Sequence, residues 1–328
     1  MTPLYENLTS LVSKSSAWLK FSSAHKTTNE LLKHNEIIEL LLRVKNKIKT
    51  TIRHHDISHR QIGEHRSVFK GYGLDYEESR RYQLGDDPRY MNWQLSARTG
   101  QHFMKVFREE RQPGVFIALD RRSSMRFGTQ QRLKITQAAR AAAIASFVAQ
   151  ENNSSVSGLI IENEFEWYQS SQNKQAIYSF IQQAARPAKA VFESEQKNEP
   201  NITDALNTLI EVLAHKQGST IYLISDFHDL TKEDQTLLLK LSSLHDIKAI
   251  HIDDKAESAL PDIGICQFSS NIKDNRISIN THDTSITESY TSIRKEQLTK
   301  VKNIFETINV TYKKISTSVS NIEDYIKL

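Results

Sequence analysis

Strands and helices alternate regularly from Val115 to the end of the chain, and this alternation restricts the fold more than any other feature. The runs typical of strands are VFIALD, VSGLIIEN, STIYLISDF, IKAIHIDD and VTYKKIS, with FEWYQS as a more polar edge strand. Helical periodicity predicts helices over 132–151, 174–186, 203–216, 231–244 and 286–308. Continuously apolar strands are typical of a parallel sheet covered by helices on both faces. We therefore expect an α/β domain over residues 114–328.

The first third of the chain is organised differently. Apolar residues at helical spacing predict two helices, over 4–22 and 29–53, so residues 1–59 are expected to form an N-terminal helical region. Residues 60–113 contain glycines, prolines and short alternating stretches such as HRSVFKG and HFMKVFRE, which predict a small β-rich module with tight turns.

Composition restricts the compartment and class of protein. The longest apolar-rich stretch, 138–149, is interrupted by Arg140 and Ser146, so no segment reaches the 18 or more apolar residues of a transmembrane helix. The N-terminal sequence MTPLYENLTS lacks the basic start and apolar core of a secretory signal, and the single cysteine cannot form an internal disulfide. We expect a globular protein in the cytoplasm, with no transmembrane segment.

The net charge of +4 conceals two regions of opposite sign. Residues 1–126 carry a net charge of +8, whereas residues 127–328 carry −4. A basic region attracts either an acidic protein surface or nucleic acid, and the charge does not distinguish these partners.

Two expected strands end in an acidic residue. Asp120 ends VFIALD, and Asp226 directly follows IYLIS. Ligands of an open α/β sheet bind at the carboxyl ends of its strands, so we expect both carboxylates at one candidate site. Ser124 follows the first strand, and Thr203 begins a later helix as its N-cap or as a ligand. Carboxylate and hydroxyl oxygens are ligands that Mg²⁺ or Ca²⁺ prefers.

This arrangement resembles the von Willebrand factor A fold, whose metal-ion-dependent adhesion site uses Asp-x-Ser-x-Ser, a later Thr and a later Asp. Asp120, Ser124, Thr203 and Asp226 match four of these positions, but Arg122 stands at the first Ser position. A guanidinium is always charged, and beside Asp120 it would supply the cation that a metal otherwise supplies. We interpret the site as a degenerate metal site and expect no bound metal, with Mg²⁺ or another divalent cation as the alternative.

A longer motif lies upstream, GYGLDYEESRRYQLGDDPRYMNWQLSARTG. It resembles the signature of the soluble branch of the prokaryotic domain of unknown function 58 family. In that family the signature precedes a von Willebrand A-like domain. The matching residues are Gly71, Gly73, Arg80, Tyr82, Gly85, Asp86, Asp87, Arg89, Trp93, Ala97, Arg98, Thr99 and Gly100. Asn92 stands where the family signature has Asp. The resemblance covers about residues 60–230.

The GDDPR segment has a structural and a functional interpretation. In the structural one, Gly85 permits a tight turn, Asp86 or Asp87 caps a helix beginning near Pro88, and Arg98 pairs with a carboxylate. In the functional one, these residues belong to a protein-docking surface. The expected interaction residues are Arg80, Asp86, Asp87, Arg89, Trp93, Arg98 and Arg122.

No catalytic set is recognisable, because the chain has neither a Gly-x-Ser-x-Gly elbow nor a Gly-rich phosphate loop. The family resemblance implies a partnership with a MoxR-type ATPase of the AAA class in the maturation or assembly of other proteins. We therefore expect a non-enzymatic adaptor or co-chaperone that binds this ATPase and other proteins, and we do not expect nucleic acid as a partner. The alternatives are a Mg²⁺-dependent hydrolase that uses Asp120 and Asp226, or a nucleic-acid-binding protein that uses the basic region.

Overall fold

The computed structural model describes residues 18–19, 31–59, 75–83, 85–108, 114–129, 131–188, 199–214, 216–269 and 276–326. The chain divides into two compact units, each described here by itself. Residues 1–50 and 113–328 form the first unit, and residues 51–112 form the second. The first unit thus includes most of the N-terminal region that the sequence pattern set apart as residues 1–59.

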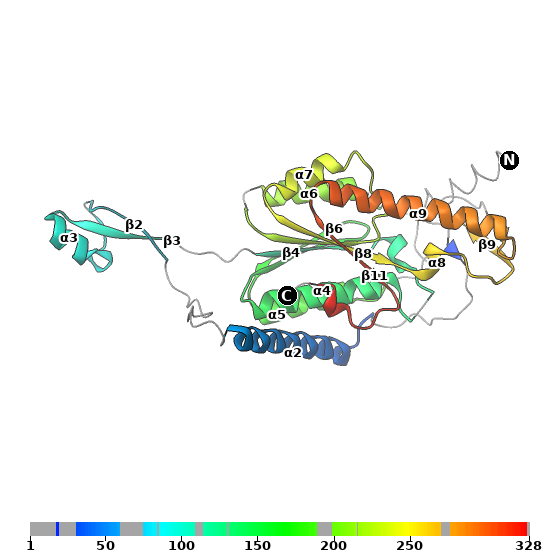
Figure 1. Ribbon diagram of the computed structural model, residues 1–328, viewed down its shortest axis with the longest axis horizontal. Coiled ribbons are helices and arrows are strands. Elements are labelled where there is room, and N and C mark those ends of the chain that lie inside the picture. Colours follow the sequence, from blue (N-terminus) through cyan, green and yellow to red (C-terminus); the bar gives the residue numbers. More distant parts are fainter. Residues whose placement is uncertain are drawn as a thin grey trace. The chain divides into compact units, whose positions relative to one another are not determined.

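A six-stranded sheet forms the centre of the first unit (Figure 1). Its spatial order is β11-β8-β7-β4-β5-β6, and neighbouring strands are parallel except β5 and β6, which are antiparallel. The strands are β4 (Val115–Asp120), β5 (Val156–Ile161), β6 (Phe165–Ser171), β7 (Thr220–Ser225), β8 (Asp246–Asp253) and β11 (Thr311–Ser316). The expected von Willebrand A-like α/β architecture is confirmed by this topology, and the FEWYQS segment lies at the edge of the sheet.

Helices cover both faces of this sheet, α4 and α5 on one face and α6, α7 and α9 on the other (Figure 1). Their bounds are α4 (Lys134–Glu151), α5 (Lys174–Ala184), α6 (Ile202–Leu213), α7 (Gln235–Ser242) and α9 (Thr284–Thr307). Strand β4 alternates between the two cores, since Ile117 and Leu119 belong to one and Phe116 and Ala118 to the other. This burial on both faces explains why the strand is continuously apolar.

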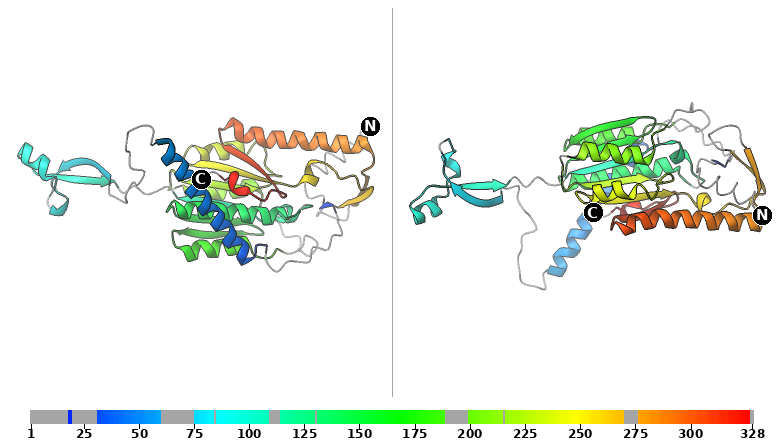
Figure 2. Two further views of the ribbon diagram at one scale, coloured as in Figure 1. Left: turned by 60° about the horizontal axis from the view of Figure 1, so that its bottom comes forward. Right: turned by 90° about the horizontal axis from the view of Figure 1, so that it is seen from above.

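Helix α2 (His34–His59) covers the outer side of the α4–α5 layer (Figure 2). Its residues Ile37, Leu40 and Val44 are buried in the same core as the alanines of α4. The backbone amide of Leu31 also donates a hydrogen bond to the carbonyl oxygen of Ala185, just after α5 (3.0 Å). The N-terminal part of α2 is therefore an outer layer of the α/β unit, which explains why α4 is buried on nearly all sides.

A small three-stranded sheet in the first unit corrects one expectation. Its order is β1-β9-β10, with β1 (Trp18–Leu19), β9 (Ile265–Ser269) and β10 (Arg276–Asn280) paired antiparallel. The helix predicted over 4–22 is wrong at Trp18–Leu19, because these residues pair with β9 instead; the rest of that segment lies outside the described residues. Helical periodicity reports only local spacing, and this pairing joins residues far apart in the sequence.

The second unit contains an antiparallel pair, β2 (Asp75–Arg81) and β3 (Phe103–Arg108). The connection between these strands holds the 3₁₀ helix η1 (Pro88–Tyr90) and the short helix α3 (Trp93–Thr99). Gly100 ends α3 with a φ of +69°, a left-handed conformation that glycine adopts without strain. The signature motif therefore folds as a hairpin whose long connection carries its most exposed side chains.

The remaining expected helices are present with ends shifted by a few residues, and the short helix α8 (Lys255–Ser258) was not predicted. No helix within the described residues is long and apolar enough to cross a membrane.

Helix α2 offers a direct test of its place in the first unit. Leu40 is 2% exposed and Leu42 is 54% exposed, so the two leucines differ chiefly in burial. We predict that Leu40→Ala lowers the free energy of unfolding by about 2–5 kcal/mol, because it leaves a cavity in a packed core. Leu42→Ala, the matched control, changes it by less than about 0.5 kcal/mol. Urea denaturation of the full chain measures both values, and equal effects would contradict the shared core.

Candidate functional site

Sheet topology brings the candidate acids to one edge. Strands β4 and β7 are parallel neighbours, with Leu119 opposite Ile224. Asp120 ends β4 and Asp226 directly follows β7, so both acids lie at the same carboxyl edge of the sheet. Strand β8, on the other side of β7, ends in Asp253. Asp120, Asp226 and Asp253 are at most 3% exposed. Carboxylates buried this deeply need positive partners, because burial alone disfavours their charged form.

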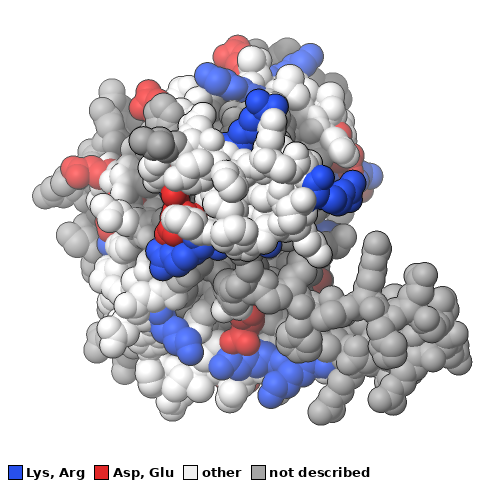
Figure 3. All heavy atoms as spheres, turned by 90° about the vertical axis from the view of Figure 1, so that its left-hand side faces the viewer, with Lys and Arg blue, Asp and Glu red and all other residues white. Residues whose placement is uncertain are grey.

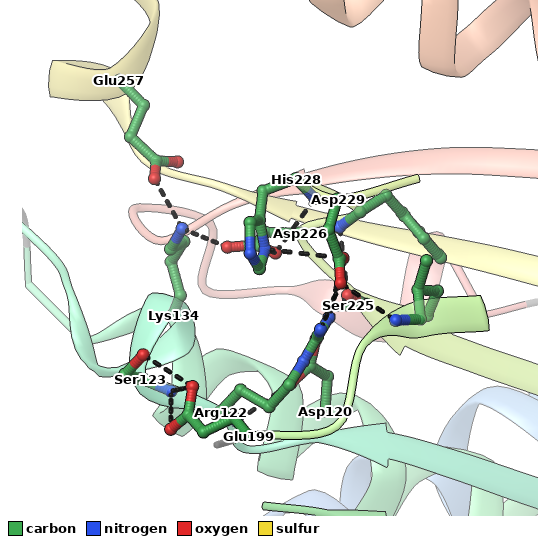
Figure 4. A network of polar contacts seen from close by, with 12 residues as sticks. Asp120, Arg122, Ser123, Lys134, Glu199, Ser225, Asp226, His228, Asp229 and Glu257 are labelled. Carbon is green, nitrogen blue, oxygen red and sulfur yellow. Dashed lines mark hydrogen bonds and ion pairs between the residues drawn. The ribbon is translucent and has the colours of Figure 1, made fainter. Parts of the chain in front are cut away.

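Arg122 is the partner of Asp120 (Figure 4). Its Nε donates to Asp120 Oδ1 (3.1 Å) and its Nη2 donates to Asp120 Oδ2 (2.8 Å), while its backbone amide also donates to Oδ1 (2.9 Å). The hydroxyl of Ser225, the last residue of β7, donates to Oδ2 as well (2.6 Å). The carboxylate is therefore fully satisfied by its own chain, in a bidentate geometry that suits a guanidinium.

The same guanidinium also binds the loop after β7. Arg122 Nη1 donates to Asp229 Oδ2 (2.5 Å) and to the carbonyl oxygen of Pro200 (3.2 Å), and its Nη2 donates to Asp229 Oδ1 (3.0 Å). Asp229 in turn accepts from the backbone amide of Ile202, the first residue of α6 (2.9 Å). Arg122 thus joins β4, the β7 loop and the start of α6 through one buried cation.

A second buried cation, Lys134, is the first residue of α4. Its Nζ lies 2.8 Å from Asp226 Oδ2 and 2.5 Å from Glu257 Oε1 of α8. Burial would lower the pKa of this lysine, but the two carboxylates outweigh burial and raise the pKa of Lys134 above its usual range. Burial likewise opposes ionisation of Asp226, whereas Lys134 and His228 hold the pKa of Asp226 well below its usual range.

His228 lies between the two carboxylates of the β7 loop (Figure 4). Its Nδ1 is 2.8 Å from Asp226 Oδ1 and 3.8 Å from Asp229 Oδ1. Burial lowers the pKa of His228 and Arg122 lowers it further, but Asp226 and Asp229 outweigh both, so the pKa is raised from its ordinary value. The imidazole therefore links the Lys134 group of ion pairs to the Arg122 group.

Backbone conformation separates the two acids of this loop. Phe227, between them, has a φ of +49°, a left-handed conformation that is uncommon for a residue with a side chain. Its backbone amide donates to Ser225 Oγ (3.0 Å), and its ring packs edge-on against His251 and Phe305. The sharp turn lets Asp226 contact Lys134 while Asp229 contacts Arg122.

Thr203 and Ser124, the other two predicted ligands, make contacts that differ from those of the expected metal site. Thr203 donates to Asp234 Oδ1 (2.6 Å), and it is not the N-cap of α6, because Asn201 caps that helix in a capping box with Asp204. Ser124 lies on the 3₁₀ helix η2 (Ser123–Arg126), and its buried hydroxyl finds no hydrogen-bond partner within the described residues.

These contacts do not fit a divalent cation. Asp120 is occupied by Arg122, Asp226 by Lys134 and His228, and Thr203 by Asp234, so the predicted oxygen ligands are directed to separate partners. Among the residues that the structure describes, no three His, Cys, Asp or Glu side chains form a group that could hold a metal ion. Positive side chains stand where a metal would have to approach these carboxylates.

In the second unit, most charged signature residues bind one another. Arg80 makes a bidentate pair with Asp86 (2.8 and 2.6 Å), and Arg89 pairs with Asp87 (2.6 Å). Asp87 also caps η1 by accepting from the Arg89 amide, as the structural interpretation of GDDPR expects. Asn92 caps α3 through its Oδ1 and donates from Nδ2 to Ser79 Oγ (2.9 Å), so here an amide uses both its acceptor and its donor.

Two aromatic side chains of the signature segment are exposed. Trp93 is 64% exposed and neighbouring Tyr90 is 43% exposed. Arg98, in the last turn of α3, is also exposed.

Sequence reasoning missed Lys134, His228, Asp229 and Glu257. Asp229 had a usable signal, since DFHD places a second acid three residues after Asp226 at the same strand end. Lys134 had none, because a lysine at the start of a helix is ordinarily exposed.

Comparisons with known proteins agree with the sequence motif. A family model described as "Protein of unknown function DUF58" matches residues 78–300. The chain is 25% identical over 206 residues to an uncharacterized protein of Mycobacterium bovis, covering 62% of each chain, and two uncharacterized proteins of Mycobacterium tuberculosis match with the same figures. The match therefore spans less than two thirds of the length of these curated relatives.

Two solved structures are similar at lower identity. The conserved hypothetical protein BatB from Bacteroides thetaiotaomicron has a TM-score of 0.42 and 13% identity, covering 65% of this chain and 95% of that chain. A PilB minor pilin from Streptococcus sanguinis has a TM-score of 0.29 and 11% identity, covering 69% of this chain and 62% of that chain.

The position of His228 predicts a specific pH dependence. Because its pKa is raised, the native state holds the proton more tightly than the unfolded state, whose histidine pKa is about 6.5. Its stabilising contribution is therefore complete below pH ~6.5 and is lost as pH rises through the native pKa, by at most about 1.4 kcal/mol per pH unit. Urea denaturation from pH 6 to pH ~9 measures this decline.

His228→Gln is the matched variant, since it keeps a polar side chain without a titrating proton. The difference in unfolding free energy between the wild-type chain and His228→Gln should shrink as pH rises above neutrality. His245 and His251, whose pKa values are lowered by burial, are present in both chains, so their contribution cancels in this difference. A difference that is constant across the window would show that Asp226 and Asp229 do not stabilise a protonated imidazole.

Proposed function

Since the chain belongs to the family described as "Protein of unknown function DUF58", we propose that it is a non-enzymatic adaptor whose partner is a MoxR-type AAA ATPase. We name this ATPase because the signature motif resembles that family, and the resemblance implies such a partner. In this proposal the second unit binds the partner, and the first unit is the folded domain to which the second unit is joined.

The exposed aromatic pair of the signature motif carries the proposal. Trp93 and Tyr90 are 64% and 43% exposed, although both are large residues with much apolar surface. Tryptophan and tyrosine are enriched in protein interfaces, where they bury a large area and keep a polar atom for hydrogen bonding. Within the described residues, most of the Trp93 side chain stays exposed, so it offers apolar surface to another protein.

Charge around the pair favours an acidic partner surface. The side chain of Arg89, adjacent to Tyr90, is 83% exposed despite its pairing with Asp87, and Arg98 is exposed on α3. Arginine beside aromatic residues is typical of binding hot spots, and its guanidinium can form bidentate pairs with carboxylates. The proposed docking surface is therefore Arg89, Tyr90, Trp93 and Arg98.

The two alternative functions receive less support. A Mg²⁺-dependent hydrolase would need Asp120 and Asp226 to bind a metal, but Arg122 and Lys134 occupy these carboxylates. On the face drawn in Figure 3, the described Lys and Arg side chains (blue) lie in several groups, and Asp or Glu side chains (red) lie beside most of them. A nucleic-acid footprint is expected to be a more continuous basic surface.

A binding experiment with the purified full chain tests the proposal. The probe is a MoxR-type AAA ATPase from the same genome, measured by pull-down and by biolayer interferometry with no nucleotide, ADP, or ATP. We predict association in at least one nucleotide state and a loss of at least about tenfold in affinity for Trp93→Ala, as expected for an aromatic hot spot.

Leu239→Ala is the matched control, because Leu239 is an apolar residue in the first unit with a similar exposure of 55%. It should bind like the wild-type chain. Absence of association in every nucleotide state would refute the ATPase as partner, and equal binding by Trp93→Ala would refute the assigned surface.

A further inference from the structure

Charges of opposite sign alternate along the carboxyl ends of β4, β7 and β8. Each acidic side chain lies between two basic ones at distances from 2.5 to 4.0 Å, except the first, which has one. In order, this ion-pair chain is Asp120, Arg122, Asp229, His228, Asp226, Lys134, Glu257, Arg294, Asp253 and Lys314. With His228 protonated, five acids and five bases balance.

Four members of the ion-pair chain are buried from water. Asp120, Arg122, Lys134 and Asp226 are each at most 3% exposed. Buried carboxylates can keep their charge only when buried positive groups compensate for the lost solvation. Arg122 directly precedes η2 and Lys134 begins α4, so both cations lie outside the sheet and bind its acidic edge to neighbouring elements.

We infer that Arg122 and Lys134 together replace a divalent cation at this edge, which makes the fold independent of metal, and that removing Arg122 alone converts the edge into a divalent-cation site. The inference concerns the first unit and does not depend on the proposed docking surface. It assigns a structural role to the two cations: they neutralise the acids of β4 and β7 and hold the loops around them.

Charge and ligand chemistry explain why Arg122 is the decisive residue. Without its guanidinium, the buried carboxylate of Asp120 loses its cation, and Asp229 loses its bidentate partner. Two carboxylates then face a space that a doubly charged ion can neutralise. Ser124 follows on the same turn, and its buried hydroxyl has no hydrogen-bond partner among the described residues. Carboxylate and hydroxyl oxygens are typical ligands of Mg²⁺ and Mn²⁺.

Metal titration of the wild-type full chain is the first test. Isothermal calorimetry with MgCl₂ and with MnCl₂ should show no saturable binding, and the melting temperature should not exceed that in NaCl of matched ionic strength. Saturable Mn²⁺ binding by the wild-type chain that Asp120→Asn abolishes would overturn the inference.

Arg122→Ser is the second test, with Mn²⁺ as the probe. In metal-free buffer this variant should melt about 10 °C lower than the wild-type chain, because it breaks a buried ion pair in a unit of this size. Millimolar MnCl₂ should recover most of that loss and give a saturable calorimetric signal. Arg122→Ser combined with Asp120→Asn should not bind Mn²⁺.

Arg89→Ser is the matched control, since it removes an arginine of which 83% of the side chain is exposed. It should change neither the melting temperature nor the response to Mn²⁺. If Arg122→Ser does not fold in metal-free buffer, refolding it with and without MnCl₂ decides the matter. Folding that requires Mn²⁺ supports the inference, whereas a variant that ignores Mn²⁺, folded or unfolded, overturns it.

Discussion

Burial of Asp120 and Asp226 at the ends of adjacent parallel strands is the constraint on which the rest of the first unit depends. Both strands lie inside a sheet with helices on each face, so water cannot solvate their terminal carboxylates. Compensation must come from side chains of the same chain, and Arg122 and Lys134 provide it. The segment that follows β4 and the start of α4 deliver these two cations.

The packing of α4 also reflects the burial of these carboxylates. A helix that begins with a buried lysine must lie close against the sheet, and alanine along most of its length permits that approach. The buried side chain of Arg140 donates from Nη2 to the carbonyl oxygen of Ser320 (2.8 Å), so polar groups on this helix fix the C-terminal segment. Helix α2 then covers the outer face, and its Ile37, Leu40 and Val44 complete the core.

Elements with a continuous local pattern could be predicted from the sequence, and contacts between distant segments could not. The strand VFIALD is apolar along its whole length because it is buried on both faces, and that pattern sufficed to place Asp120 at the carboxyl edge. The strand Trp18–Leu19 has no such signal, since it is defined only by pairing with β9. Thr203 was misplaced even though Asn201 and Asp204 have the spacing of a capping box.

The second unit has an unusual connection to the first: the chain leaves the α/β unit within α2 and returns to it just before β4. Docking of α2 onto α4 therefore closes a loop that contains the entire signature module. The entropy of closing a loop grows only with the logarithm of its length, and doubling or halving the length changes it by about 0.6 kcal/mol. Insertions and deletions in this module would thus barely alter the stability of the sheet, which leaves its size and surface free to diverge between relatives while the α/β unit stays the same.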